Sequence, residues 1–193
     1  MSTSEIPLYI DLKSPYAFIA SHRALALEAE GKAAFDWRPF KLEIGSRAGA
    51  DPEAFLRRAR YIYRDVRRFA GPLGLTVRGP TKIYDSMTAL VGLLYAKSAG
   101  VHRAYIATAF TKFFNRELDP GDVEAVTALL ANCGADADRF ASYLAGPGAD
   151  QFSAGQEEAQ ELGICGAPMF VVGEELYWGQ DRMDMALAAA GIA

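Results

Sequence analysis

The stretch DLKSPYAFIA, residues 11–20, decides how the N-terminal part of this chain folds. It follows an apolar run at about 7–12 that predicts a β-strand, and Ser14-Pro15 then opens a helix at about 15–30. Serine is a favoured N-cap residue and proline is favoured at the first helical position, so capping alone explains the pair. The same corner presents unpaired helix N–H groups, which favour an anion. Ser14 is therefore either a plain cap or a hydrogen-bond donor to an anionic ligand.

The composition is that of a globular protein with an acidic balance. The chain has 193 residues, of which 51% are hydrophobic and 23% charged, and its net charge of -4 argues against a nucleic-acid partner. There is no run of about 18 apolar residues, and Met1–Glu5 lacks the basic start of a signal peptide, so we expect no membrane partner and a cytoplasmic location. Two cysteines, Cys133 and Cys165, and two histidines predict no metal site and no disulfide scaffold.

The remaining segments divide into a helical middle and a short αββα end. A second strand around 35–38 completes a βαβ unit, and a loop rich in glycine and small residues follows at about 40–50. Helical periodicity and capping signals predict helices at 51–70, 85–99, 102–114, 120–133, 137–144 and 149–162. The C-terminal stretch predicts strand 169–172, a turn at Gly173-Glu174, strand 176–178 and a helix from about Asp181.

This order predicts an α/β fold, a thioredoxin-like βαβ–αββα domain with an inserted all-helical domain. The C-terminal hairpin needs the N-terminal strands as partners, because two strands alone form a marginal sheet. We therefore assign residues 1–45 and 149–193 to the thioredoxin-like domain and residues 46–148 to the helical insertion domain.

In a thioredoxin-like fold, the corner at Ser14 holds the reactive group, which is a cysteine thiolate in redox members. A serine cannot exchange disulfides, but its hydroxyl can donate a hydrogen bond to a thiolate that a ligand brings. Ala167-Pro168 stands where such folds place a cis proline facing this corner, and a trans proline at a sheet edge is the alternative. Asp181, before the last helix, either caps that helix or holds the ammonium group of a ligand.

Five stretches, taken together and in this order, resemble the 2-hydroxychromene-2-carboxylate isomerases and their relatives, the kappa-class glutathione transferases. The stretches span nearly the whole chain and are DLKSPYAFIA, FDWRPF, RYIYRDVRRFAG, GAPMFVV and YWGQDRMD. The resemblance implies a thioredoxin-like domain with a helical insertion, a homodimer, glutathione as cofactor and a small aromatic substrate.

The resemblance also implies roles for individual residues. Ser14 would be the catalytic residue that contacts the glutathione sulfur. Ala167, ahead of a cis Pro168, would pair with the cysteinyl backbone of glutathione. Gln180 and Asp181 would hold its γ-glutamyl end.

A basic residue of the first insertion helix would meet the glycyl carboxylate of glutathione. Arg58 has the matching position, and Arg57 and Arg60 are close rivals. The chain departs from its relatives at Lys13, where an uncharged residue is usual, and a cation there could favour a thiolate. It also carries Asp85-Ser86 where relatives tend to have asparagine, ahead of the second insertion helix.

The implied activity is a glutathione-dependent isomerisation of an unsaturated aromatic carboxylic acid, from 2-hydroxychromene-2-carboxylate to trans-o-hydroxybenzylidenepyruvate, in aromatic catabolism. Tyr16, Phe40 and Trp178 would line its apolar pocket, or belong to the core. A glutathione transferase or peroxidase is the first alternative. It would use the same thiolate but would consume glutathione, whereas an isomerase would not. A thiol–disulfide oxidoreductase is the second, with Cys165 as the nearest thiol, although we expect that residue to be a small buried hydrophobe.

Overall fold

The structure, a computed structural model, describes residues 5–44 and 51–192. Part of the predicted loop, residues 45–50, and the predicted domain boundary at 45/46 lie outside the described residues, as do residues 1–4 at the start of the chain. The helices and strands run in the order β1 (Ile6–Ile10), α1 (Pro15–Ala29), β2 (Phe35–Pro39), α3 (Pro52–Ala70), η1 (Gly71–Leu73), α4 (Met87–Ser98), α5 (His102–Phe114), α6 (Val123–Asn132), α7 (Phe140–Leu144), α8 (Pro147–Glu161), β3 (Met169–Val172), β4 (Glu175–Trp178), η2 (Gln180–Arg182) and α9 (Met183–Ala189).

The four strands form one sheet in the order β2-β1-β3-β4. β1 is parallel to β2, with α1 as the crossover, and antiparallel to β3. β3 and β4 form a hairpin across Gly173-Glu174, where the positive φ of Gly173 (61°) suits a tight turn. The predicted α/β fold is confirmed, because the C-terminal hairpin joins the sheet through β1, which comes from the other end of the chain.

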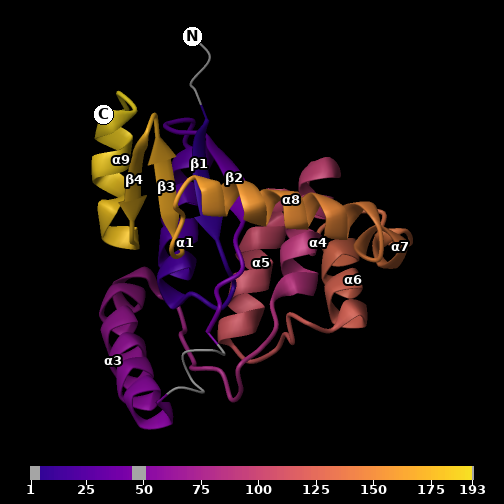
Figure 1. The fold of residues 1–193 in the computed structure, drawn as a ribbon, viewed down its shortest axis with the longest axis horizontal. Coiled ribbons are helices and arrows are strands. Elements are labelled where there is room, and N and C mark those ends of the chain that lie inside the picture. Colours follow the sequence, from indigo (N-terminus) through magenta and orange to yellow (C-terminus); the bar gives the residue numbers. More distant parts are fainter. Residues whose placement is uncertain (1–4, 45–50, 193) are drawn as a thin grey trace.

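The two faces of the sheet bury alternate residues of its central strand. Leu8 and Ile10 belong to the main core with Trp37 of β2, and α1 and α9 contribute to the same core. Tyr9 points to the opposite face, where it packs with Met169 and with residues of α8 and the turn after it. Helices therefore cover both faces of the sheet, and Figure 1 shows α8 crossing in front of it from α7 back towards β3.

The inserted helices pack on α1 through stacked aromatic rings. Phe18 of α1 lies parallel to Phe110 and Phe114 of α5, with ring centroids 5.6 and 5.2 Å apart. α4 and α5 approach closely at Gly92, where an added Cβ would lie 2.4 Å from the Tyr105 hydroxyl. α3 packs against α1 and stands apart from the group of α4 to α7 (Figure 1).

The predicted boundaries differ from the observed ones mainly at helix starts. α4 begins at Met87 because the carboxylate of Asp85 accepts the Met87 N–H and so ends the preceding loop. α6 begins at Val123 because Asp122 caps it, whereas the sequence suggested Pro120. The last helix begins as the 3₁₀ turn η2 and continues as α9. No helix within residues 5–44 or 51–192 has the length and apolar character needed to cross a bilayer.

Candidate active site

The turn between β1 and α1 places Ser14 at the N-terminus of the helix. Its backbone is extended (φ -87°, ψ 112°), and Pro15 takes the first helical position. The Ser14 Oγ accepts a hydrogen bond from the Ala17 N–H at 3.1 Å, so the predicted cap is present. The same hydroxyl donates to the Ala167 carbonyl oxygen at 2.7 Å. One serine, 5% exposed, therefore joins the start of α1 to the segment ahead of β3.

Ala167 precedes a cis peptide bond to Pro168, so of the two predicted alternatives the cis proline is observed. The Pro168 carbonyl accepts the Gly179 N–H at 3.0 Å, which ties the end of β4 to this peptide. The Ala167 N–H makes no hydrogen bond with any residue in 5–44 or 51–192. A backbone donor without a partner beside a helix N-terminus is suited to pair with a carbonyl of an extended ligand.

Gln180 and Asp181 follow Gly179 directly and lie in η2. Gly179 has φ 117°, and an added Cβ would lie 2.6 Å from the Asp181 Oδ1, so glycine is required for the carboxylate to fold back over the turn. Asp181 caps neither η2 nor α9, and its Oδ2 instead accepts a hydrogen bond from Arg182 at 2.8 Å. The capping alternative is therefore wrong. The Asp181 side chain is 58% exposed and can reach a ligand's ammonium group.

Tyr16 links the start of α1 to α3, a contact that sequence reasoning missed. Its hydroxyl donates a hydrogen bond to the Asp65 Oδ2 at 2.7 Å. Burial raises the pKa of Tyr16, and the hydrogen bond and charge of Asp65 raise it further, as do Tyr61 and Asp181. The phenol therefore stays protonated with its proton directed at Asp65. Ser14, and not Tyr16, is left as the side-chain donor for an anion at this corner.

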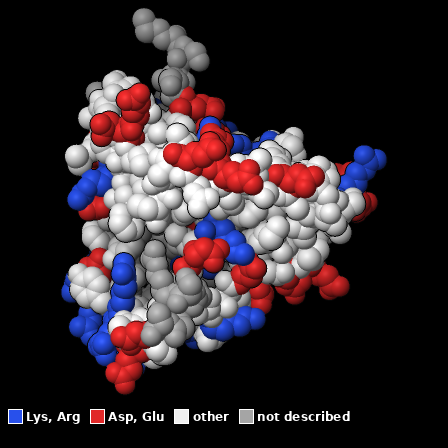
Figure 2. All heavy atoms as spheres, in the orientation of Figure 1, with Lys and Arg blue, Asp and Glu red and all other residues white. Residues whose placement is uncertain are grey.

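Arg58 is exposed on α3, and the helix geometry favours it over its two rivals. It lies seven residues before Asp65, which is two turns of helix, so both residues occupy the face that looks toward Tyr16. Arg60 is about 140° around the helix from Asp65, and Arg57 bonds to Glu53 at 3.2 Å. Figure 2 shows basic side chains gathered over α3, while acidic ones gather along α8. The role of Arg58 stays a prediction.

Asp11 and Lys13 form a buried ion pair immediately before Ser14. The Asp11 side chain has no exposed surface and that of Lys13 is 7% exposed, with 3.5 Å between the Lys13 Nζ and the Asp11 Oδ2. Burial raises the pKa of Asp11, opposed by the Lys13 ammonium group and by two backbone N–H groups. Because the ammonium group is occupied by Asp11, Lys13 is not the free cation for a thiolate that its sequence position suggested.

Three other residues that the sequence placed near the site, Trp178, Phe40 and Cys165, have different surroundings in the structure. Trp178 is 56% exposed, and its indole covers Gly166, where a Cβ would lie 2.5 Å from the Nε1. Phe40 packs edge-on against Tyr9 and so borders the core. Cys165 is exposed, which makes the expectation of a buried thiol wrong. The turn after α8 directs its neighbour Ile164 inward and leaves Cys165 outside.

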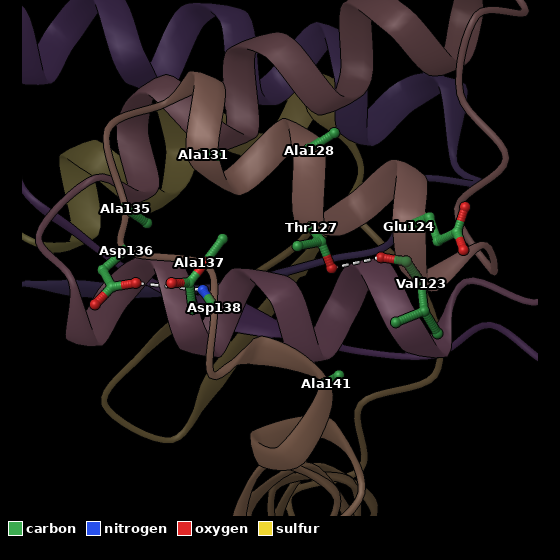
Figure 3. Close-up of a pocket in the computed structure, with 10 residues that line it drawn as sticks. All are labelled: Val123, Glu124, Thr127, Ala128, Ala131, Ala135, Asp136, Ala137, Asp138 and Ala141. Atoms are coloured by element: carbon green, nitrogen blue, oxygen red, sulfur yellow. Dashed lines mark hydrogen bonds between the residues drawn. The ribbon is translucent and has the colours of Figure 1, made fainter.

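Two surface depressions lie away from Ser14. One, of about 560 Å³, runs between α6 and α7, and half of the residues that line it are alanines. Figure 3 shows its Thr127 hydroxyl bonded to the Val123 carbonyl. The other, of about 310 Å³, lies between β2, α4 and α8. Its Arg38 is paired with Asp36 and Glu158, both at 2.6 Å. Neither depression gathers groups for catalysis, so the β1–α1 turn remains the candidate site.

A family model described as a DsbA-like thioredoxin domain matches residues 5–190. The chain belongs to the DsbA-like thioredoxin family. In this DsbA-like protein a serine occupies the corner between β1 and α1. Its two cysteines lie elsewhere, Cys133 at the end of α6 and Cys165 ahead of β3.

Curated relatives confirm the resemblance that the five stretches predicted. The 2-hydroxychromene-2-carboxylate isomerase of Sphingobium xenophagum is 23% identical over 188 residues, which cover 94% of this chain and 95% of that protein. The enzyme of the same name from Pseudomonas putida is 25% identical over 193 residues, covering 96% and 94%.

Solved structures share the DsbA-like fold. A 2-hydroxychromene-2-carboxylate isomerase superposes with a TM-score of 0.81 at 23% identity, covering 97% of this chain and 95% of the other. The cytosolic disulfide reductase DsbM of Pseudomonas aeruginosa, with glutathione, gives 0.61 at 17% identity, covering 97% and 96%. At these identities the likeness establishes the fold alone.

Proposed function

We propose that this protein is a glutathione-dependent isomerase of an unsaturated aromatic carboxylic acid of the 2-hydroxychromene-2-carboxylate type. The observation that carries the proposal is the Ser14 hydroxyl, held between the N-terminus of α1 and the Ala167 carbonyl where redox members of the fold carry a cysteine. A hydroxyl there can stabilise a bound thiolate and cannot exchange disulfides. The curated relatives named as isomerases over nearly the whole chain support the same activity.

The residues at the corner fit glutathione in three respects. The Ala167 N–H, without a partner among the described residues, suits the cysteinyl backbone of glutathione. The exposed carboxylate of Asp181, beside Gln180, suits the γ-glutamyl ammonium group. Arg58, on the face of α3 that carries Asp65, suits the glycyl carboxylate. The predicted homodimer and the predicted cytoplasmic location stay predictions.

When bound, glutathione would supply a thiolate nucleophile for reversible addition to the conjugated double bond of the substrate, the chemistry that permits rotation about that bond. The protein holds the negative charge in place during this cycle. The Ser14 O–H would turn from the Ala167 carbonyl to the sulfur, and the N-terminus of α1, the positive end of the helix dipole, lies at the same corner. Burial of Ser14 excludes water and so strengthens both interactions.

One observation favours a thiol–disulfide oxidoreductase as a second candidate. Cys165 is exposed and stands two residues before Ala167 in the sequence, so its thiol is accessible to a disulfide in solvent. A redox role would require Cys165 to exchange with a substrate disulfide and would not require Ser14. Reduction of insulin by the wild-type protein that is lost in Cys165→Ser would favour this candidate over the isomerase.

The isomerase assay uses the purified protein, 2-hydroxychromene-2-carboxylate and glutathione. We expect trans-o-hydroxybenzylidenepyruvate to form well above the uncatalysed rate, and the total free thiol to stay constant because glutathione is regenerated. Loss of free thiol in step with substrate would show a transferase instead. Equal rates with and without the protein would rule out the isomerase.

A further inference from the structure

Asp11 and Lys13, the ion pair next to Ser14, both bind the backbone of a third residue, Leu42, which follows β2. The Asp11 Oδ1 accepts the Lys13 N–H at 2.9 Å, and the Asp11 Oδ2 accepts the Leu42 N–H at 2.7 Å. The Lys13 Nζ donates to the Leu42 carbonyl oxygen at 2.7 Å. The two side chains therefore hold both polar backbone groups of Leu42, 31 positions after Asp11.

The same carboxylate shapes the turn that presents Ser14. Asp11 binds the N–H two residues ahead with its side chain, and its backbone carbonyl accepts the Ser14 N–H at 3.0 Å. This is the local pattern by which aspartate fixes a turn. A single buried residue thus sets the direction of the chain into α1 and ties that turn to the segment after β2.

The ion pair of Asp11 and Lys13 adds no net charge beside Ser14, so its effect on the site comes from the hydrogen bonds that it makes. Asp11 and Lys13 neutralise each other, and the Ser86 hydroxyl lies beside the Asp11 carboxylate. Asp85 acts on Lys13 from the start of α4 and is itself paired with Lys41 at 3.1 Å. Apolar residues commonly replace a buried ion pair with no loss of stability, so folding alone does not require one here.

We propose that Asp11 and Lys13 are positioning residues that hold Ser14 in register with its ligand by clamping the Leu42 peptide against the β1–α1 turn. The part of this proposal that concerns the ligand rests on the proposed function, because Ser14 acts there on the glutathione sulfur. The part that concerns the clamp stands on the protein alone.

The test compares two double variants, each of which removes one positive and one negative charge. Asp11→Asn with Lys13→Met removes the clamp. Lys32→Met with Glu30→Gln removes an exposed ion pair at the far end of α1 and is the control. Two quantities are measured: the hydrogen-exchange rate of the Leu42 amide in the free protein, and the affinity for glutathione relative to S-methylglutathione.

In the clamp variant we expect the Leu42 amide to exchange at least about tenfold faster than in the wild type, because its carboxylate acceptor is weakened and its carbonyl is released. We expect the preference for glutathione over S-methylglutathione to fall to that of Ser14→Ala. The control should keep both wild-type values. Should the clamp variant not fold, Asp11→Asn with Lys13→Gln, which leaves polar side chains and no unpaired charge at the buried site, serves in its place.

A Leu42 amide that exchanges at the wild-type rate in the clamp variant would overturn the proposal, as would an unchanged preference for glutathione. Equal weakening of both ligands would overturn it as well, because that result indicates a general effect on the fold. If the wild type itself shows no preference for glutathione, the proposed function has failed, and the Leu42 exchange rate alone decides whether the clamp exists.

Discussion

Replacing Ser14 with alanine is expected to lower the isomerase kcat about a hundredfold, because removing one donor from a developing or bound anion costs on that order. The hydroxyl is a donor whose acceptor in the free protein is the Ala167 carbonyl, so it is held in place before the ligand arrives. The remaining activity comes from the dipole of α1, because the substitution removes the cap of the helix and leaves the helix itself in place. The measurement is kcat and the affinity for glutathione across a pH series, where the thiol of bound glutathione should titrate at higher pH in the variant.

Ser21→Ala is the matched control for this substitution. Ser21 lies on the same helix and is 2% exposed, but its Oγ has no hydrogen-bond partner among the described residues. Its loss should leave kcat and the pH series unchanged and should not lower the stability. Ser14→Ala also removes a helix cap, worth about 1 kcal/mol of unfolding free energy, so thermal unfolding is followed in parallel. Wild-type kcat in Ser14→Ala would contradict the role assigned to the hydroxyl.

Gly179→Ala is expected to weaken glutathione binding about tenfold and to lower the free energy of unfolding by about 1–3 kcal/mol, the usual cost of a strained backbone at a non-glycine residue. The backbone at Gly179 (φ 117°, ψ 153°) is a conformation that glycine alone adopts readily. An added Cβ would also meet the Asp181 carboxylate at 2.6 Å and push it away from its present position. The hydrogen bond from the Gly179 N–H to the Pro168 carbonyl would be disturbed as well.

Gly173→Ala separates the effect on binding from the effect on the backbone. Gly173 has φ 61° at the tip of the β3–β4 hairpin, and no atom lies within 4 Å of an added Cβ. We expect a loss of about 1 kcal/mol in stability and no change in affinity for glutathione. Calorimetry and thermal unfolding of both variants give the comparison. An affinity that falls equally in the two variants would show that Asp181 is not part of the binding site.

The sequence predicts the secondary structure best where turn chemistry and periodicity agree. Ser14-Pro15 marks the start of α1 because serine and proline have separate, local reasons to stand there. The strand 169–172 is bounded by a proline and a glycine, and it is observed with those limits. The helices predicted from Asp85 and Pro120 begin later in the structure, at Met87 and Val123. In each case an aspartate side chain accepts an N–H two residues ahead and so delays the first helical turn.

Contacts between segments that are distant in the sequence could not be predicted from the sequence. The hydrogen bond from Tyr16 to Asp65 joins two helices, and the residue pattern within either helix does not predict it. The burial of Asp11 depends on Leu42, so the residue could have faced solvent or the corner. An aspartate three residues before a Ser-Pro helix start was, however, a usable signal, since aspartate commonly fixes such turns. The choice between a cis and a trans Pro168 also depends on distant partners, the Ser14 hydroxyl and Gly179.

The central claim is that the Ser14 corner binds the thiolate of glutathione. Calorimetric titration of the wild-type protein with glutathione and with S-methylglutathione tests this claim most directly, because the methyl group removes the ionisable thiol and leaves the rest of the ligand unchanged. We predict binding of glutathione that is weakened at least about tenfold by methylation, the effect of losing a charge-assisted hydrogen bond at a buried site. Equal binding of the two ligands, or binding of neither, would contradict the claim.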